Sequence, residues 1–188
     1  DHDNHDHAHD HHDHEHHDDD HAPVTWGVIA IVAIPVLLGI LVPPEPLGAS
    51  AVNGGVSTAS VGVGDAESAA RAPLERTIID WLRQFEASDN LTQFAGQPVD
   101  VVGFVYHEPG FGDQDIMLAR FAISCCVADA FAIGLPVHVG DVSQHSVDSW
   151  LRVRGTLEIG TFDGREMPIV RPSTIETVPM PRDPYLYT

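Results

Sequence analysis

The sequence predicts a mainly β protein with one transmembrane helix, and three observations lead to this fold class. The run Val24–Val42 contains nineteen apolar or small residues without a charge, which is long enough for a membrane helix. After Gly96, apolar and polar residues alternate in five segments, as they do in β-strands. Residues 1–22 are almost wholly His, Asp and Glu and offer nothing to a core. The predicted parts are a disordered tract (1–22), a transmembrane helix (23–43), a linker (44–72) and a soluble β-barrel-like domain (73–188).

The N-terminal tract predicts metal binding. Ten of its 22 residues are His and nine are Asp or Glu. Such a segment cannot offset its ordering entropy, so we expect it to be disordered. Imidazole and carboxylate are ligands for zinc and similar metals, which predicts several weak, interchangeable sites that fade below about pH 6. Zinc is the first candidate, followed by nickel, cobalt and copper; a solvated acidic tail and a purification tag are the alternatives. The candidate ligands are His2, His5, His7, His9, His11, His12, His14, His16, His17 and His21.

The apolar run has the marks of a membrane helix. Trp26 lies near its start, where an interfacial aromatic is expected, and membrane helices tolerate a residue such as Pro35. A signal peptide is the alternative, but its apolar core follows a basic segment, and here the preceding residues are acidic. The chain starts inside the tract without Met, so we expect a truncated or processed product.

The charge of the chain argues against two classes of partner. The net charge is -19, all nine basic residues are Arg, and the tract has no basic residue at all. Nucleic acids and anionic membrane surfaces need clustered Lys and Arg, so neither is expected as a partner. The positive-inside rule gives almost no information on membrane orientation, because very few basic residues lie near the helix. We expect the protein to lie in a bacterial cell membrane, with its C-terminal domain on the extracytoplasmic side.

The C-terminal domain predicts a short helix followed by a small barrel. Pro73 suits the first turn of a helix that ends near Phe85 and places Ile78, Leu82 and Phe85 on one face. Glycines near the middle of the first and fourth strands indicate the sharp bends of a five-stranded OB-like barrel, with a short helix within Asp141–Asp148. A small β-sandwich is the alternative. The predicted strands are Gln97–Tyr106, Asp115–Ser124, Asp129–Val139, Trp150–Ile159 and Met167–Val178.

Two adjacent cysteines at the end of the second predicted strand are the candidate site of the domain. Cys125 and Cys126 lie close to Asp129, and these three residues offer soft and hard ligands within one turn. A metal or thiol site could be completed in space by His107, His138 or His145. Small buried cysteines without a function, and a vicinal disulfide, are the alternatives. Because neighbouring residues of a strand point to opposite faces, only one sulfur is expected to point inward.

Known catalytic motifs are missing from the sequence. It contains no nucleophile elbow, P-loop, dinucleotide fingerprint or HExxH motif, and the cysteines lack a recognisable base, so we do not expect an enzyme. The aromatic residues are expected in the core and not as platforms for bases. Arg120 is expected to pair with a carboxylate, either Asp129 or Asp100.

Several stretches carry a resemblance to a known family: the His/Asp tract, Ile34–Pro35, Leu41–Pro44, Gly103–Tyr106, Leu118–Phe121, Cys125–Ala130 and Pro184–Tyr187. On these stretches the chain resembles the YcgQ-like family of uncharacterised membrane proteins, described as permease subunits, over nearly its whole length. This resemblance implies further N-terminal spans and a separate multi-spanning permease as partner, with metal as a plausible cargo. Members of the family vary at Cys125, so Cys126 and Asp129 are the better metal ligands.

These observations combine into one functional hypothesis and one alternative. We expect a membrane-anchored accessory subunit of a permease that takes part in the handling or export of a divalent transition metal such as zinc. Its partners would be the multi-spanning permease, the metal ion and the lipid bilayer. The alternative is a membrane-tethered scaffold whose barrel binds a protein and which has no metal role.

Overall fold

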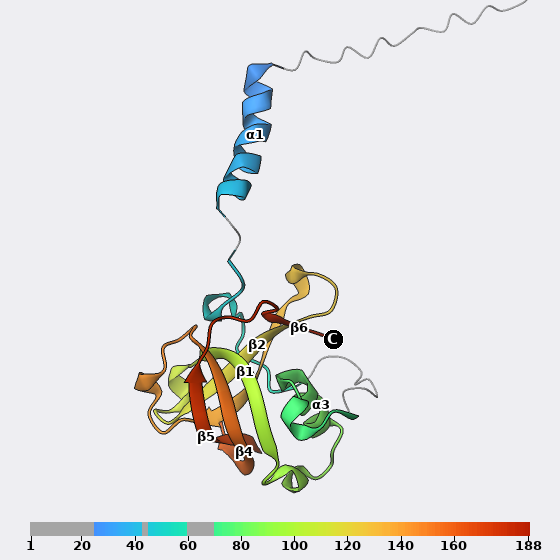
Figure 1. Cartoon of the computed structure of the whole chain (residues 1–188), viewed down its shortest axis with the longest axis vertical. Helices are drawn as coiled ribbons and strands as arrows, with labels where there is room; N and C mark the ends of the chain where they lie inside the picture. The colour runs from blue at the N-terminus through green and yellow to red at the C-terminus, as the bar shows by residue number, and fades with distance from the viewer. Residues whose placement is uncertain (1–24, 43–44, 60–69) are drawn as a thin grey trace, which may run out of the picture. The chain divides into compact units, whose positions relative to one another are not determined.

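The structure is a computed structural model that describes residues 25–42, 45–59 and 70–188 (Figure 1). The chain divides into two compact units, Asp1–Glu45 and Pro46–Thr188, each of which is described by itself. The predicted tract, with its ten histidines, lies outside the described residues.

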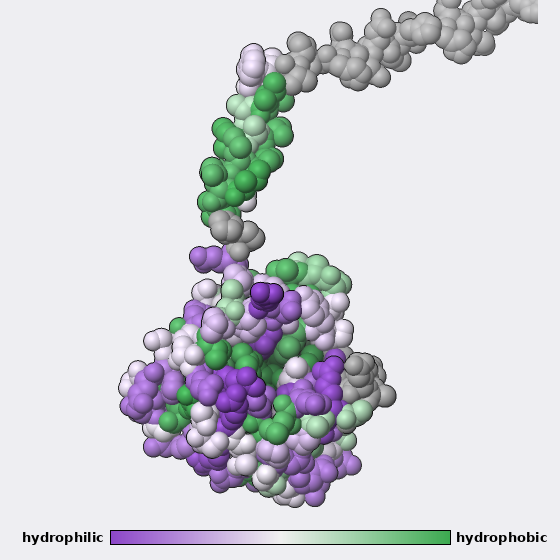
Figure 2. Space-filling model, viewed as in Figure 1, coloured by the Kyte–Doolittle hydropathy of each residue, from purple (hydrophilic) through white to green (hydrophobic). Residues whose placement is uncertain are grey.

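The apolar run forms one helix, α1, from Trp26 to Leu41. Its described side chains are exposed or half-buried, and Figure 2 shows hydrophobic residues along the visible side of the helix. The helix has 16 residues, which at 1.5 Å per residue is about 24 Å, compared with a hydrocarbon core of about 30 Å. No helix in the described part of the chain is long and apolar enough to cross a membrane. A helix over this run is therefore present, but the predicted membrane span over residues 23–43 is not supported.

A second helix, α3, covers Ile78–Glu86. It starts later than predicted because Thr77 caps it: the Asp80 N–H donates to Thr77 Oγ1, and the Thr77 N–H donates to the Asp80 carboxylate at 2.9 Å. Pro73 instead opens a separate 3-10 turn, Pro73–Glu75. The predicted apolar face of the helix is buried in the core.

Five strands close into a barrel in the order β1-β4-β5-β3-β2, and β2 pairs back with β1 (Figure 1). The pair β3–β5 is parallel, and the other pairs within the barrel are antiparallel. The prediction of a small five-stranded barrel is confirmed, although the helix expected between the third and fourth strands is only the 3-10 turn Val142–Gln144. The strands are β1 Pro98–Tyr106, β2 Asp115–Ile123, β3 Phe131–His138, β4 Trp150–Phe162 and β5 Arg165–Thr177.

The glycines at the centres of β1 and β4 are needed where strands approach closely. A Cβ on Gly103 would lie 2.6 Å from the carbonyl oxygen of Ala119. A Cβ on Gly155 would lie 2.0 Å from the carbonyl oxygen of Arg171, next to an irregularity in the register of β4 and β5. Neither site can hold a larger residue unless the backbone moves.

The segment 46–59, inside the predicted linker, lies against the barrel. The Ser57 N–H donates to the Ala132 carbonyl at 2.9 Å, and the Ser57 carbonyl accepts from the Gly134 N–H at 3.0 Å. Leu47, Ala49, Ala51, Val52 and Val56 pack against a buried cluster that includes Phe104 and Phe121. This segment, called the strap below, therefore contributes to the fold of the barrel.

A short sixth strand, β6 (Tyr185–Tyr187), pairs in parallel with β2 and was not predicted. Arg120, only 8% exposed, holds the chain that leads into it. Its guanidinium donates to the carbonyls of Asp183 at 2.6 Å and Pro184 at 2.8 Å, and it reaches Val102 at 3.4 Å. The fourth acceptor is the Tyr185 carbonyl at 3.3 Å.

The prediction that Arg120 pairs with Asp100 or Asp129 is wrong. Asp100 is bound by two other guanidiniums, from Arg152 at 2.6 Å and Arg154 at 3.1 Å. Asp129 lies beyond the end of β2 and accepts backbone N–H groups. Arg120 therefore satisfies backbone carbonyls where β2 leaves β1 and pairs with β6.

Candidate metal centre

The candidate site lies in the connection between β2 and β3. This connection, gold in Figure 1, follows Ile123 and contains the 3-10 turn Val127–Asp129. Among the described residues, one group of three or more His, Cys, Asp or Glu side chains is arranged so that it could hold a metal ion. It consists of Cys125, Cys126 and Asp129, whose ligand atoms all lie within 4.8 Å of one another.

The Asp129 carboxylate organises this turn through the backbone. It accepts the N–H groups of Ser124 at 3.3 Å, Cys125 at 2.8 Å and Cys126 at 3.4 Å. These bonds fold the chain back as soon as the strand ends, so the alternation of a strand no longer applies to the two cysteines. As a result, both sulfurs lie near the same carboxylate.

Asp129 and the Cys125 thiol shift each other's pKa. Hydrogen bonds from the Cys125 thiol and then from the Cys125 backbone hold the pKa of the Asp129 carboxyl below its ordinary value. The hydrogen bond to Asp129, followed by one to Cys126, raises the pKa of the Cys125 thiol. Near neutral pH, Cys125 therefore keeps its proton unless a cation displaces it.

Both cysteines are exposed free thiols, so the alternative of two small buried residues is wrong. A thiolate at the surface is open to metals and to exchange with other thiols, whereas a buried cysteine is inert. The geometry is therefore compatible with ligand binding or thiol chemistry.

The histidines considered as further ligands do not join the cluster. His138 Nδ1 pairs with an Asp115 carboxylate oxygen at 2.8 Å, and His107 Nε2 lies 2.8 Å from the Gly112 carbonyl. His145 follows the 3-10 turn Val142–Gln144 and belongs to no metal-binding group in the described chain. The prediction that one of them completes the site is wrong.

Sequence reasoning found Cys126 and Asp129 but set Cys125 aside, whereas the structure brings all three together. The signal was present in the spacing: an acidic residue three positions after Cys126 is typical of a capping box at the start of a helical turn. The ten histidines of the tract lie outside the described residues, so their part in any site stays a prediction.

The C-terminal end of the chain lies beside the cluster. Ser124 Oγ lies 2.7 Å from Thr188 Oγ1, and the Thr188 N–H donates to the Ile123 carbonyl at 3.2 Å. The residue before the two cysteines is thus tied to the last residue of the chain.

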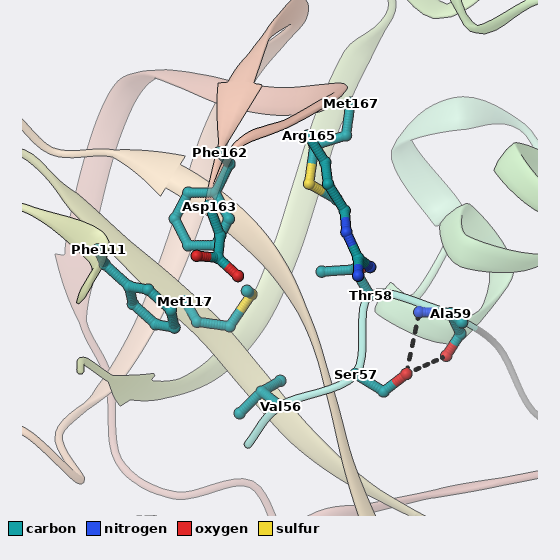
Figure 3. Close-up of a pocket in the computed structure, with 10 residues that line it drawn as sticks. All are labelled: Val56, Ser57, Thr58, Ala59, Phe111, Met117, Phe162, Asp163, Arg165 and Met167. Atoms are coloured by element: carbon teal, nitrogen blue, oxygen red, sulfur yellow. Dashed lines mark hydrogen bonds between the residues drawn. The ribbon is translucent and has the colours of Figure 1, made fainter. Parts of the chain in front are cut away.

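A second candidate is a small cavity of about 220 Å³ beside the strap (Figure 3). Figure 3 shows the side chains of Phe111, Met117 and Phe162 close together, with Asp163 and Arg165 nearby. Sites for small molecules usually exceed about 300 Å³, so this cavity suits one side chain of a partner better than a substrate. Its lining residues are Val56, Ser57, Thr58, Ala59, Phe111, Met117, Phe162, Asp163, Arg165 and Met167.

Comparisons with known proteins agree with the predicted resemblance. Residues 77–188 match the family described as the DUF1980 C-terminal domain, which covers α3, the barrel and β6. The UPF0703 protein YcgQ of Bacillus subtilis is 27% identical over 111 residues, which are 57% of this chain and 39% of that protein. A protein of Streptococcus mutans, named "Putative two-component membrane permease complex subunit", is 27% identical over 97 residues, or 50% of this chain and 35% of its own length. The matched region thus spans well under half of each relative.

Proposed function

Because the chain belongs to the family of the DUF1980 C-terminal domain, we propose that it acts as an accessory subunit of a membrane permease complex. The observation that carries the proposal is that the match covers α3, the five barrel strands and β6 together. The name of the streptococcal relative supports the assignment to a permease complex. Transport itself would belong to a multi-spanning partner, and we attribute no catalytic activity to this chain.

The proposal includes a transition metal as the ion that the complex handles. Two features support it: the exposed cluster of Cys125, Cys126 and Asp129, and the ten histidines of the tract 1–22. Imidazole-rich segments suit zinc, which is therefore the first candidate for the tract. In this proposal the tract collects the ion and the barrel receives it or contacts the permease.

Membrane attachment through α1 and its flanking residues is a further part of the proposal. A helix that is apolar on all sides belongs in a protein core or in lipid, and none of its described residues is buried within this chain. The bilayer or the helices of the permease would cover it. We place the complex in a bacterial cell membrane, with the barrel on the extracytoplasmic side.

One observation favours a second candidate function, a scaffold that binds a protein without a metal role. The cavity beside the strap is lined by Phe111, Met117 and Phe162 together with polar residues such as Asp163 and Arg165, and its volume of about 220 Å³ fits one side chain of a partner (Figure 3). In that case the tract would be incidental to the function.

Metal tolerance of cells separates the two candidates. We would compare the full chain with a variant that lacks residues 1–22, a Cys126→Ala variant and a Glu166→Gln control at an exposed site on β5. The metal proposal expects lower tolerance of zinc, copper or silver in the first two variants, while copurification with the permease continues. Wild-type tolerance in both variants would contradict it. If a cavity substitution such as Phe162→Ala then abolished copurification, the scaffold would be supported.

A further inference from the structure

We propose that Cys125 and Cys126 form a two-sulfur site for a soft monovalent d¹⁰ cation, Cu⁺ or Ag⁺, with Asp129 as a positioning residue and not as a ligand. This inference rests on the proposed function, because it names the class of ion that the barrel of a metal-handling subunit would receive. It also includes Cys125 in the site, beside Cys126.

The carboxylate of Asp129 is already engaged by the backbone. One oxygen accepts the Cys125 N–H at 2.8 Å, and the other accepts the N–H groups of Ser124 and Cys126 at 3.3 and 3.4 Å. A metal on either oxygen would compete with the bonds that hold the turn together. Asp129 is therefore better suited to holding the two sulfurs in place than to binding the ion.

The two sulfurs are placed so that one ion can bridge them. Their ligand atoms lie within 4.8 Å of one another, and two metal–sulfur bonds of about 2.3 Å span up to about 4.6 Å. Both cysteines are exposed free thiols, so an ion carrier can reach them.

The number of donors decides the class of ion. A structural zinc site needs four ligands, and no His, Asp or Glu of the described chain besides Asp129 belongs to this group. Thiolates favour soft ions, and a soft monovalent d¹⁰ ion is satisfied by two of them. The described site thus falls short for structural zinc but is sufficient for Cu⁺ or Ag⁺.

The binding step needs no oxidant or reductant. Each thiol loses its proton to water or buffer, and each sulfur donates an electron pair to the cation. One cation and two thiols therefore give a bis-thiolate complex with one net negative charge and two released protons. Exchange of thiolates with another two-sulfur carrier would pass the ion on without a change of oxidation state.

The test uses the full chain, purified without oxygen and titrated with Cu⁺ in the presence of a chromophoric Cu⁺ chelator. The variants are Cys125→Ser, Cys126→Ser, the double variant, and Ser124→Ala as a neighbouring control. Titration at about pH 5.5 weakens the histidines of the tract, because imidazole protonates there. We expect the wild type and the control to bind one equivalent more than the double variant, and each single variant to lose affinity at least tenfold.

X-ray absorption on the wild type gives a second readout that does not depend on the folding of a variant. Two sulfur neighbours and no light-atom ligand are expected for bound Cu⁺. The absence of an oxygen neighbour in this spectrum distinguishes Asp129 as a positioning residue from Asp129 as a ligand. A nitrogen or oxygen ligand on the ion, or equal binding by the double variant, would overturn the proposal.

Zinc titration of the same proteins and of Asp129→Asn separates this inference from the proposed function. Zinc that binds to the cluster more tightly than Cu⁺ and is lost in Asp129→Asn would overturn the two-sulfur site but leave metal handling intact. Conversely, two-sulfur Cu⁺ binding in vitro, combined with normal tolerance of zinc, copper and silver in cells with the double variant, would support the site and contradict the metal role.

Discussion

Arg120 and Asp129 organise the chain in opposite ways, one within β2 and the other just beyond its end. Arg120 is a cation that gathers four backbone carbonyls, and Asp129 is an anion that gathers three backbone N–H groups. Arg120 is 8% exposed, whereas Asp129 is exposed to solvent. Water competes with the bonds of Asp129 but hardly with those of Arg120. The same kind of bond therefore stabilises the fold at one place and only positions reactive groups at the other.

The largest effect is expected from Arg120→Met, which removes the donors and leaves the four carbonyls in a partly dry site. Because unsatisfied buried polar groups are costly, we expect a loss of about 3 kcal/mol of folding free energy. For a unit of this size the melting temperature should fall by roughly 10 °C. Thermal unfolding followed by circular dichroism measures it, with Arg165→Met at the exposed start of β5 as control. If the two variants had the same melting temperature, Arg120 would not hold β6.

Arg120→Lys separates the charge from the geometry of the guanidinium. An ammonium group is a compact donor and cannot reach carbonyls on both sides as the planar guanidinium does. We therefore expect an intermediate melting temperature and faster amide exchange at Tyr185–Tyr187. Hydrogen exchange with mass spectrometry measures the second effect. Full protection of β6 in the lysine variant would show that charge alone is sufficient.

Asp100 is more exposed than Arg120 and less exposed than Asp129, and its contribution to stability can be tested by changing the pH. Hydrogen bonds from Arg152 and then from Arg154 hold the pKa of Asp100 below its ordinary value, although partial burial opposes this. The stability that Asp100 gains from the two guanidiniums is therefore present above about pH 4 and is lost as the pH falls through the lower pKa of the folded state. Asp100→Asn should reduce the loss of folding stability as the pH falls, whereas Asp113→Asn, in an exposed turn, should not. If the wild type and Asp100→Asn lost the same amount of stability as the pH fell, Asp100 would not be the group responsible.

The smallest effect on stability is expected from Asp129→Asn. Because the bond to Asp129 raises the pKa of Cys125, loss of the charge should lower that pKa and increase the thiolate at neutral pH. We expect a small shift in melting temperature but a several-fold faster reaction of Cys125 with a thiol reagent, measured in a Cys126→Ser background. An unchanged rate would mean that Asp129 does not control the thiol.

The strands and the apolar face of α3 could be predicted because their signal is local. Alternation of apolar residues located all five barrel strands, and the glycines at positions 103 and 155 correctly indicated close approaches. The strap and β6 could not be predicted, because residues 46–59 have no period and β6 has only three residues. Both are stabilised by partners far away in the sequence.

The candidate site was predicted only in part for the same reason. Residue type and spacing pointed to the cluster, but strand alternation allowed only one sulfur to point inward, and the family resemblance favoured Cys126 and Asp129 over Cys125. That rule ends with the strand at Ile123, and the N–H bonds to Asp129 then decide where the sulfurs lie. The positions of His107, His138 and His145 depend on how the barrel closes, and a local sequence pattern does not predict that.

The two ends of the Pro46–Thr188 unit meet, and this has a consequence for how the protein is made. The Leu47 N–H donates to the Tyr185 hydroxyl at 3.2 Å across 138 residues of sequence. Chains leave the ribosome from the N-terminus, and contacts of large sequence separation form late. The bond between the strap and Tyr185 can therefore form only after Tyr185 has been synthesised, and until then the two ends of the unit are not joined. Nascent chains that stall shortly before Tyr185 should consequently lack the bond that joins the two ends of the unit.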